Sequence, residues 1–232
     1  MKVSDYFENK ERFEKMIEEF FEYLCENELE IYNEFSFQHE LGIFLRYKLR
    51  KECDDGKEYK IEFERNAKKY FNINYSFINS KVLKKEIDIS IYKYDHSQQY
   101  AIELKFPLNG QYPEQMFSCV KDVRFMQELV NQKKFQKTYC ITLVWARGRG
   151  RSFYKGNHEG NRGIDIYKYF RGDYKELLTG KILKPTGREK YIIDLQDKKY
   201  PFQWKDCKII NINARDPKYK YRDCKYYIIE SQ

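Results

Sequence analysis

Near the N-terminus, apolar residues recur every three or four positions among acidic ones, which is the spacing of one face of an amphipathic helix. These apolar positions are Phe13, Ile17, Phe20 and Leu24. The pattern predicts a helix over about 5–32. A second helix is expected to begin after a Ser36 cap and to end near residue 51, because a Cys-Asp-Asp-Gly turn follows at 53–56.

Alternating apolar and polar residues come next and predict β-strands. The alternating segments are 59–63, 86–92 and 100–106. Residues 139–145 are almost all apolar, which is typical of a strand buried on both faces. Before that strand, Pro113 at a first helical position, followed by an apolar stripe, predicts a third helix. The expected order is two helices, three strands, a helix and a strand.

The C-terminal part of the chain is less regular. An Arg-Gly-Arg-Gly-Arg loop occupies 147–151, and short strand-like stretches follow it. These stretches are 163–170, 191–195, 208–212 and 225–229. We therefore divide the chain into an N-terminal amphipathic helix at 1–34, a core at 35–146, and a basic β-rich elaboration at 147–232 that packs on the core. The predicted fold class is α/β, with a mixed central sheet flanked by helices.

Composition excludes several classes of protein. With 232 residues and 41% apolar side chains, the chain is long enough for one α/β domain with a sizeable core. Its longest apolar stretch, 139–146, is far shorter than the ~20 residues of a membrane helix, so no membrane partner is expected.

The N-terminus and the cysteines point to an intracellular protein without local metal motifs. The sequence opens without a secretory or transit signal, so the expected location is cytoplasmic. Six cysteines lie far apart with no Cys-x-x-Cys pair, and there are three histidines. Local spacing therefore provides neither a zinc site nor a redox motif, and free buried thiols are expected.

The net charge of +8 is unevenly distributed along the chain. Residues 1–34 carry 4 basic and 11 acidic side chains, residues 35–146 carry 19 and 14, and residues 147–232 carry 21 and 11. Beyond residue 34 the chain is thus +15. A basic body of this size suits a polyanion such as DNA, because neutralised phosphates release condensed counterions. A lysine-rich solvated surface explains the charge equally well.

The candidate chemistry lies in one tripeptide of the type acid-x-Lys. Nine such tripeptides occur in this highly charged chain, and only Glu103-Leu104-Lys105 lies inside an apolar strand. Residues two apart on a strand face the same side, so Glu103 and Lys105 are expected to project together. Leu104 is expected to pack on the other face.

The preceding strand is expected to place a second acid beside Glu103. Its three isoleucines, at 87, 89 and 91, should share one face and leave Asp88 on the other. Two carboxylates held together repel each other, and a divalent cation compensates them. Mg²⁺ typically takes one or two carboxylates, with water and substrate phosphate as further ligands. Asp88 and Glu103 are thus the expected metal ligands, and Lys105 is expected to orient or activate the attacking water.

Asp88, Glu103 and Lys105, set in strands between helices, resemble the motif of the PD-(D/E)xK nuclease superfamily. The resemblance covers about residues 35–146 and implies a restriction-endonuclease-like fold. Ile87 stands where this family often has a proline, which is frequently replaced.

The same resemblance implies two further site residues on helices. The family often takes an acid from a helix before the sheet, and Glu40 matches it as a catalytic residue that supports the site. It often takes a glutamine from the helix after the motif strand, for which Gln115 is the candidate and Gln127 the rival.

The resemblance implies a metal-dependent endodeoxyribonuclease of the restriction or defence type, with Mg²⁺ as its cofactor and Mn²⁺ as a substitute. DNA is the expected partner. A homodimer is also expected, with its interface on the acidic N-terminal helix, because double-strand cutters often need two active sites. The alternatives are a non-catalytic nucleic-acid-binding or partner-binding module on a nuclease-like fold, and a junction-resolving, repair or RNA-cleaving enzyme.

Polar and basic residues outside the motif are candidates for contact with nucleic acid, and the guanidinium groups among them bind phosphate in a bidentate manner. The candidates are Gln115, Arg147, Arg149, Arg151 and Lys155. A solvated surface loop is an equally simple interpretation of the last four. Glu64 is expected on a solvated face, and Asp122 is expected to balance charge on the third helix rather than to position phosphate.

Overall fold

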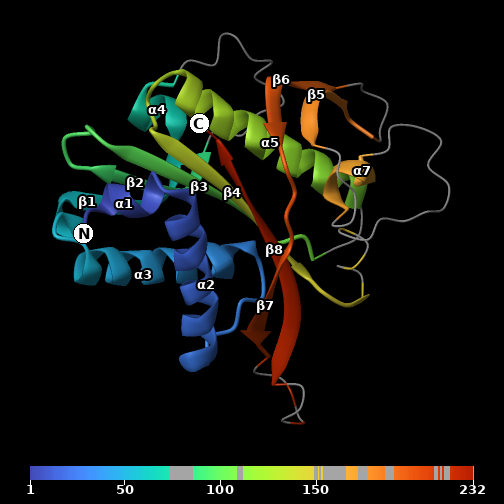
Figure 1. The fold of residues 1–232 in the computed structure, drawn as a ribbon, viewed down its shortest axis with the longest axis horizontal. Helices are drawn as coiled ribbons and strands as arrows, with labels where there is room; N and C mark the ends of the chain where they lie inside the picture. Colours follow the sequence, from blue (N-terminus) through green and yellow to red (C-terminus); the bar gives the residue numbers. More distant parts are fainter. Residues whose placement is uncertain are drawn as a thin grey trace.

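The computed structural model describes most of the chain as one mixed α/β fold. The described residues are 1–73, 86–108, 112–148, 151, 153, 166–171, 177–185, 191–211, 214, 216 and 220–231. They form a central mixed sheet with helices on both faces (Figure 1), so the predicted α/β class with a mixed central sheet is confirmed.

The central sheet has six strands in the order β1-β2-β3-β4-β8-β7. The strands are β1 (Tyr59–Asn66), β2 (Glu86–Lys93), β3 (Gln99–Lys105), β4 (Lys137–Trp145), β7 (Lys205–Ile210) and β8 (Tyr221–Ser231). Neighbouring strands are antiparallel except β3 and β4, which run parallel. Parallel neighbours need a long crossover, and helix α5 (Tyr112–Asn131) supplies it.

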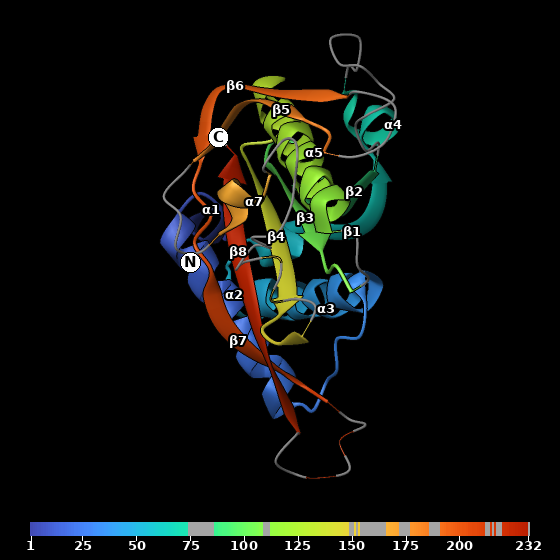
Figure 2. The same ribbon diagram turned by 90° about the vertical axis from the view of Figure 1, so that its right-hand side faces the viewer.

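Helices cover both faces of this sheet (Figures 1 and 2). One face packs against α1 (Val3–Phe7), α2 (Lys10–Glu26) and α3 (Glu34–Glu52), and the short 3-10 turn η1 (Gly56–Glu58) leads from α3 into β1. The other face packs against α5. It also carries α4 (Ala67–Phe71), α7 (Tyr167–Phe170) and a two-stranded sheet of β5 (Leu178–Leu183) and β6 (Ile192–Tyr200).

Alternation along β3 divides the interior into two cores. Ile102 and Leu104 are fully buried on the side of α1–α3, whereas Ala101 is buried on the side of α5. On the α1–α3 side, Phe13 of α2 stacks on Tyr139 of β4 with ring centroids 3.6 Å apart. The apolar face of α2 is therefore used for packing within the chain and is not open as a dimer interface.

Helix α3 lies very close to β1. An added Cβ at Gly42 would lie 2.2 Å from ring atoms of Phe63, so only glycine allows this approach. The approach holds the middle of α3 against β1, the strand that pairs with β2 of the candidate motif.

Helix boundaries near the N-terminus differ from the sequence-based expectation. The predicted helix over 5–32 is two helices, because Asn9 accepts a hydrogen bond from the Arg12 backbone and begins α2. Asn33, and not Ser36, caps α3. Ser36 is the third residue of that helix and completes a capping box with Asn33.

The C-terminal part differs more. Tyr167–Phe170 is helical where a strand was predicted over 163–170, and β5 was not predicted at all. Strands β7 and β8 are not a layer added to the core. Strand β8 pairs with β4 from Cys224 to Ser231 and so continues the central sheet.

Two predictions from composition concern membrane spans and thiols. No helix in the described part of the chain is both long and apolar enough to cross a bilayer. All six cysteines are free and four of them are buried, as expected.

Candidate active site

Asp88 and Glu103 interlock where β2 and β3 separate. The regular ladder between these strands ends at the pair Ile89 and Ile102. Beyond it, the Asp88 carboxylate accepts a hydrogen bond from the Leu104 backbone at 2.7 Å, and the Glu103 carboxylate accepts one from the Asp88 backbone at 3.2 Å. Both acids are buried, at 3% and 1% exposure. Side chains therefore replace the ladder and hold the two acids close together.

Strand β1 has an irregularity opposite Asp88 of β2. Glu64 has a φ of +52°, and it lies between the strand pairs Phe63–Ile89 and Arg65–Ile87. Such a φ is uncommon outside glycine and concentrates at functional sites. The Gln38 side-chain amide bridges the gap, because it donates to the Asp88 carbonyl at 2.6 Å and to the Glu64 carboxylate at 2.9 Å.

The same irregularity changes which way Ile87 faces. Ile89 and Ile91 pack on the side of α1–α3, as expected, but Ile87 packs in the core on the side of α5. The expectation that all three isoleucines share a face is therefore wrong for Ile87. Simple alternation fails here because β2 loses its regular pairing with both neighbours around Asp88.

Lys105 lies at the end of β3 among carboxylates from two helices. Its ammonium nitrogen is 3.0 Å from Glu34 Oε1 and 3.5 Å from Asp122 Oδ2. Burial by itself lowers the pKa of Lys105, but Asp122, Glu34, Glu103 and Asp88 outweigh burial and raise that pKa well above its ordinary value. Lys105 is therefore a positive charge at neutral pH.

Helix termini and strand ends set the positions of these partners. Glu34 is the first residue of α3, directly after the Asn33 cap. It also accepts a hydrogen bond from the Phe106 backbone at 3.2 Å, which ties the start of α3 to the end of β3. Asp122 is buried on α5, the helix that crosses from β3 to β4.

The structure brings Asp88, Glu103 and Lys105 together, but it does not join Glu40 to them. Glu40 makes no hydrogen bond or ion pair with another described residue. It comes two residues after Gln38, or about 200° around the helix, and so lies on a different side of α3. We call Asp88, Glu103 and Lys105 the cluster. The contacts that α3 makes with the cluster come instead from Gln38 and Glu34.

Sequence reasoning missed three of these contacts. Gln38 carried a usable signal, since it is a polar residue between apolar neighbours of a helical stripe. Glu34 carried none, because it lies at the boundary between the predicted N-terminal segment and the core. Asp122 was interpreted as balancing charge on its own helix, and the structure instead places it next to Lys105. Glu64 is exposed, as expected, yet it contacts Gln38.

The two glutamines on α5 lie in different surroundings. Gln115 is seven residues before Asp122, so it lies on the same side of the helix about 10 Å away. Gln127 is fully buried and donates to the Leu195 carbonyl of β6 at 3.5 Å. Of these two residues, only Gln115 lies on the side of the helix that faces the cluster.

The basic candidates after β4 are only partly described. Arg147 is 88% exposed and lies 3.1 Å from Asp223 of β8. Arg151 is exposed. Arg149 and Lys155 lie outside the described residues.

The donor set at Asp88 and Glu103 suits a hard divalent cation that keeps water among its ligands. Among the described residues, no group of three or more His, Cys, Asp or Glu side chains is arranged to hold one metal ion. A protein site would thus rest on two carboxylates, within the one or two that Mg²⁺ takes when water and substrate phosphate complete its shell. Carboxylate oxygens are the ligands that this cation prefers, so the residues present fit it.

Comparisons with known proteins add no relative. No protein-family model matches the chain, and neither a curated protein nor a solved structure matches it.

Proposed function

We propose that the protein is a metal-dependent nuclease that hydrolyses phosphodiester bonds of DNA, with a restriction-endonuclease-like fold. The observation that carries the proposal is the buried, interlocked pair Asp88 and Glu103 with Lys105 beside it. The arrangement lies in an antiparallel three-strand meander followed by a helical crossover to a parallel strand. That topology agrees with the superfamily that the motif resembles.

Asp88 and Glu103 are the proposed ligands of Mg²⁺, and Mn²⁺ is expected to replace it. When bound, the cation would neutralise charge on the phosphate that is cleaved. The two acids reach this position because each is fixed to the backbone of the other's strand. Preorganisation of this kind means that little rearrangement is needed when the substrate arrives.

Lys105 is proposed as a fixed positive charge rather than as a base. Its raised pKa keeps it protonated, so it cannot accept a proton from water at neutral pH. It can donate hydrogen bonds to a phosphate oxygen or to the attacking water. Glu34 and Asp122 hold the ammonium in place from two sides.

The second candidate is a nucleic-acid-binding module that does not cut. The observation that favours it is the lack of a three-residue ligand group among the described residues. In that case the acids around Lys105 would serve only to hold β2, β3, α3 and α5 together.

A cleavage assay distinguishes the two candidates. Supercoiled plasmid, linear duplex, single-stranded DNA and RNA are incubated with the protein in Mg²⁺, Mn²⁺ or EDTA. We expect cleavage of a DNA form that requires the metal and that Glu103→Gln abolishes. Glu230→Gln is the matched control, because the side chain of this acid is also buried and ion-paired, to Lys137, but it lies on β8 and on the opposite face of the sheet. Metal-independent binding without cleavage of any form would favour the module.

A further inference from the structure

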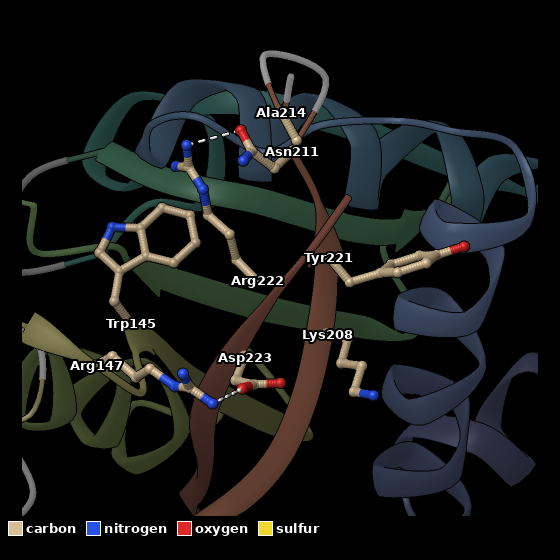
Figure 3. A pocket seen from close by; sticks show the side chains of 8 residues that line it. All are labelled: Trp145, Arg147, Lys208, Asn211, Ala214, Tyr221, Arg222 and Asp223. Carbon is tan, nitrogen blue, oxygen red and sulfur yellow. Dashed lines mark hydrogen bonds and ion pairs between the residues drawn. The ribbon is translucent and has the colours of Figure 1, made fainter. Parts of the chain in front are cut away.

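A cavity lies at the end of β4, beside the hairpin of β7 and β8 (Figure 3). Its volume is about 840 Å³, within the size range of ligand sites. The lining residues are Trp145, Arg147, Lys208, Asn211, Ala214, Tyr221, Arg222 and Asp223. We call this cavity the hairpin groove.

The hairpin groove combines cations with aromatic rings. Arg222 lies over Trp145, with its guanidinium carbon 5.0 Å from the ring centroid. The same guanidinium donates to Asn211 at 2.7 Å, which fixes its orientation. Tyr221 is 45% exposed. Three basic residues and one acid line the groove, so it is suited to an anion that also carries a flat ring.

The hairpin groove lies next to the candidate active site. The Phe106 ring contacts the Trp145 ring, with centroids 5.1 Å apart, and the Phe106 backbone contacts Glu34, the partner of Lys105. Along the sheet, Lys105 pairs with Thr142, and Trp145 lies three residues further on, about 10 Å away.

We propose that the hairpin groove binds unpaired nucleotides of the substrate strand, next to the phosphate that is cleaved. Two adjacent bases stack, one on the Tyr221 ring and one on the guanidinium of Arg222, and Arg147 and Lys208 contact the flanking phosphates. Aromatic and guanidinium stacking together with a basic surface is how single strands are held without base-specific contacts. The inference rests on the proposed function for its substrate, but it is tested by binding alone.

Fluorescence anisotropy with a labelled oligothymidylate of twelve nucleotides tests the proposal. The buffer contains EDTA, so that cleavage does not occur. We expect Tyr221→Ala and Arg222→Ala each to weaken binding about tenfold or more. Tyr94→Ala and Lys51→Ala are matched controls: Tyr94 is 61% exposed and paired with Lys60, and Lys51 lies at the C-terminal end of α3. Both controls should bind like the unmodified protein.

A second readout uses the tryptophan in the groove. In a Trp204→Phe background, Trp145 is the remaining tryptophan of the two in the chain, and the oligonucleotide should quench its emission. Arg147→Ala should reduce the slope of log affinity against log salt by about 1. Unchanged affinity in Tyr221→Ala and Arg222→Ala, or no binding of the single strand, would overturn the inference. If these variants weaken binding but the protein cleaves no nucleic acid, the proposed function is refuted and the binding site in the groove is still supported.

Discussion

At the scale of single residues, Lys105 is the charge on which the candidate site depends. Acids from β2, β3, α3 and α5 all act on it, and together they outweigh the cost of burial. A raised pKa in the folded state means that the ammonium stabilises the fold at every pH below its unfolded value of about 10.4. That contribution is lost only as the pH rises through the higher folded value.

Because acids raise the pKa of Lys105, Asp122→Asn should change how the cleavage rate depends on pH. Asp122 is the largest of the acidic contributions to Lys105, so its removal should lower the pKa of the lysine. If cleavage needs the ammonium, the variant should lose rate as the pH approaches 10.5, whereas the unmodified protein keeps its ammonium because the pKa of Lys105 lies above this range. The measurement is the rate of plasmid nicking between pH 7 and 10.5. Asp95→Asn, in an exposed turn, should leave the profile unchanged. A variant profile that overlays that of the unmodified protein would show that Asp122 does not act through Lys105.

A second residue-scale prediction separates Glu40 from Gln38. Gln38 holds the Asp88 carbonyl, so Gln38→Ala should reduce metal-dependent cleavage at least tenfold by loosening Asp88. Glu40→Gln should have little effect, because this side chain has no contact with the cluster in the described part of the chain. Initial nicking rates at saturating Mg²⁺ measure both. A large loss in Glu40→Gln with normal activity in Gln38→Ala would restore the role that the sequence motif suggested.

At the scale of elements, strand and helix packing explains what alternation could and could not predict. Four strands of the central sheet and both long helices that flank the motif follow from apolar periodicity. The motif itself was recoverable because Glu103 and Lys105 lie inside an apolar strand, where charges are costly unless they have a function. Glu34 and Asp122 were not, because their roles arise from contacts between elements that are far apart in the sequence, whereas Gln38 could be singled out as a polar residue within an apolar stripe. Ile87 was misplaced because alternation assumes a regular ladder.

The approach of α3 to β1 predicts that Gly42→Ala destabilises the protein, although alanine usually favours a helix over glycine. The new methyl group would overlap the Phe63 ring, and overpacking of this kind costs about 1–3 kcal/mol. Thermal unfolding should show a melting temperature lower by several degrees. In the double variant with Phe63→Leu, part of the loss should return. Equal stability of Gly42→Ala and the unmodified protein would contradict the close contact.

The pair of β1 and β2 predicts an acid-sensitive contribution to stability. The hydrogen bond from Arg65 lowers the pKa of Glu62, burial opposes this, and the hydroxyl of Tyr92 reinforces it. A depressed pKa stabilises the fold above the unfolded value of about 4.3, and the benefit is lost as the pH falls through the folded value. Glu62→Gln should therefore cost about 1 kcal/mol at pH 7, measured by urea unfolding, and less at pH 3. A cost that is the same at both pH values would argue against the ion pair.

At the scale of the whole molecule, the acidic residues of the candidate site and the basic residues of the hairpin groove lie in two separate regions of one sheet. The acids gather where β2 and β3 separate, and cations with aromatic rings line the hairpin groove at the end of β4. Strands β7 and β8 join these regions, because they extend the same sheet that carries the motif. The basic C-terminal part of the chain is thus placed beside the motif by the sheet itself. Composition alone could not predict this, since it shows the charge but not the strand order.

The most direct test of the central claim is the rate at which Lys105→Ala nicks supercoiled plasmid at saturating Mg²⁺, relative to the unmodified protein. Lys93→Ala is the control, because Lys93 is also a half-buried lysine that pairs with two acids, at the other end of β2. Loss of one preorganised donor at a reacting phosphate costs about 10²–10³ in rate. We predict a loss of that size in Lys105→Ala and none in Lys93→Ala, with both variants folded by circular dichroism. Equal nicking by Lys105→Ala and the unmodified protein, or nicking that persists in EDTA, would contradict the account.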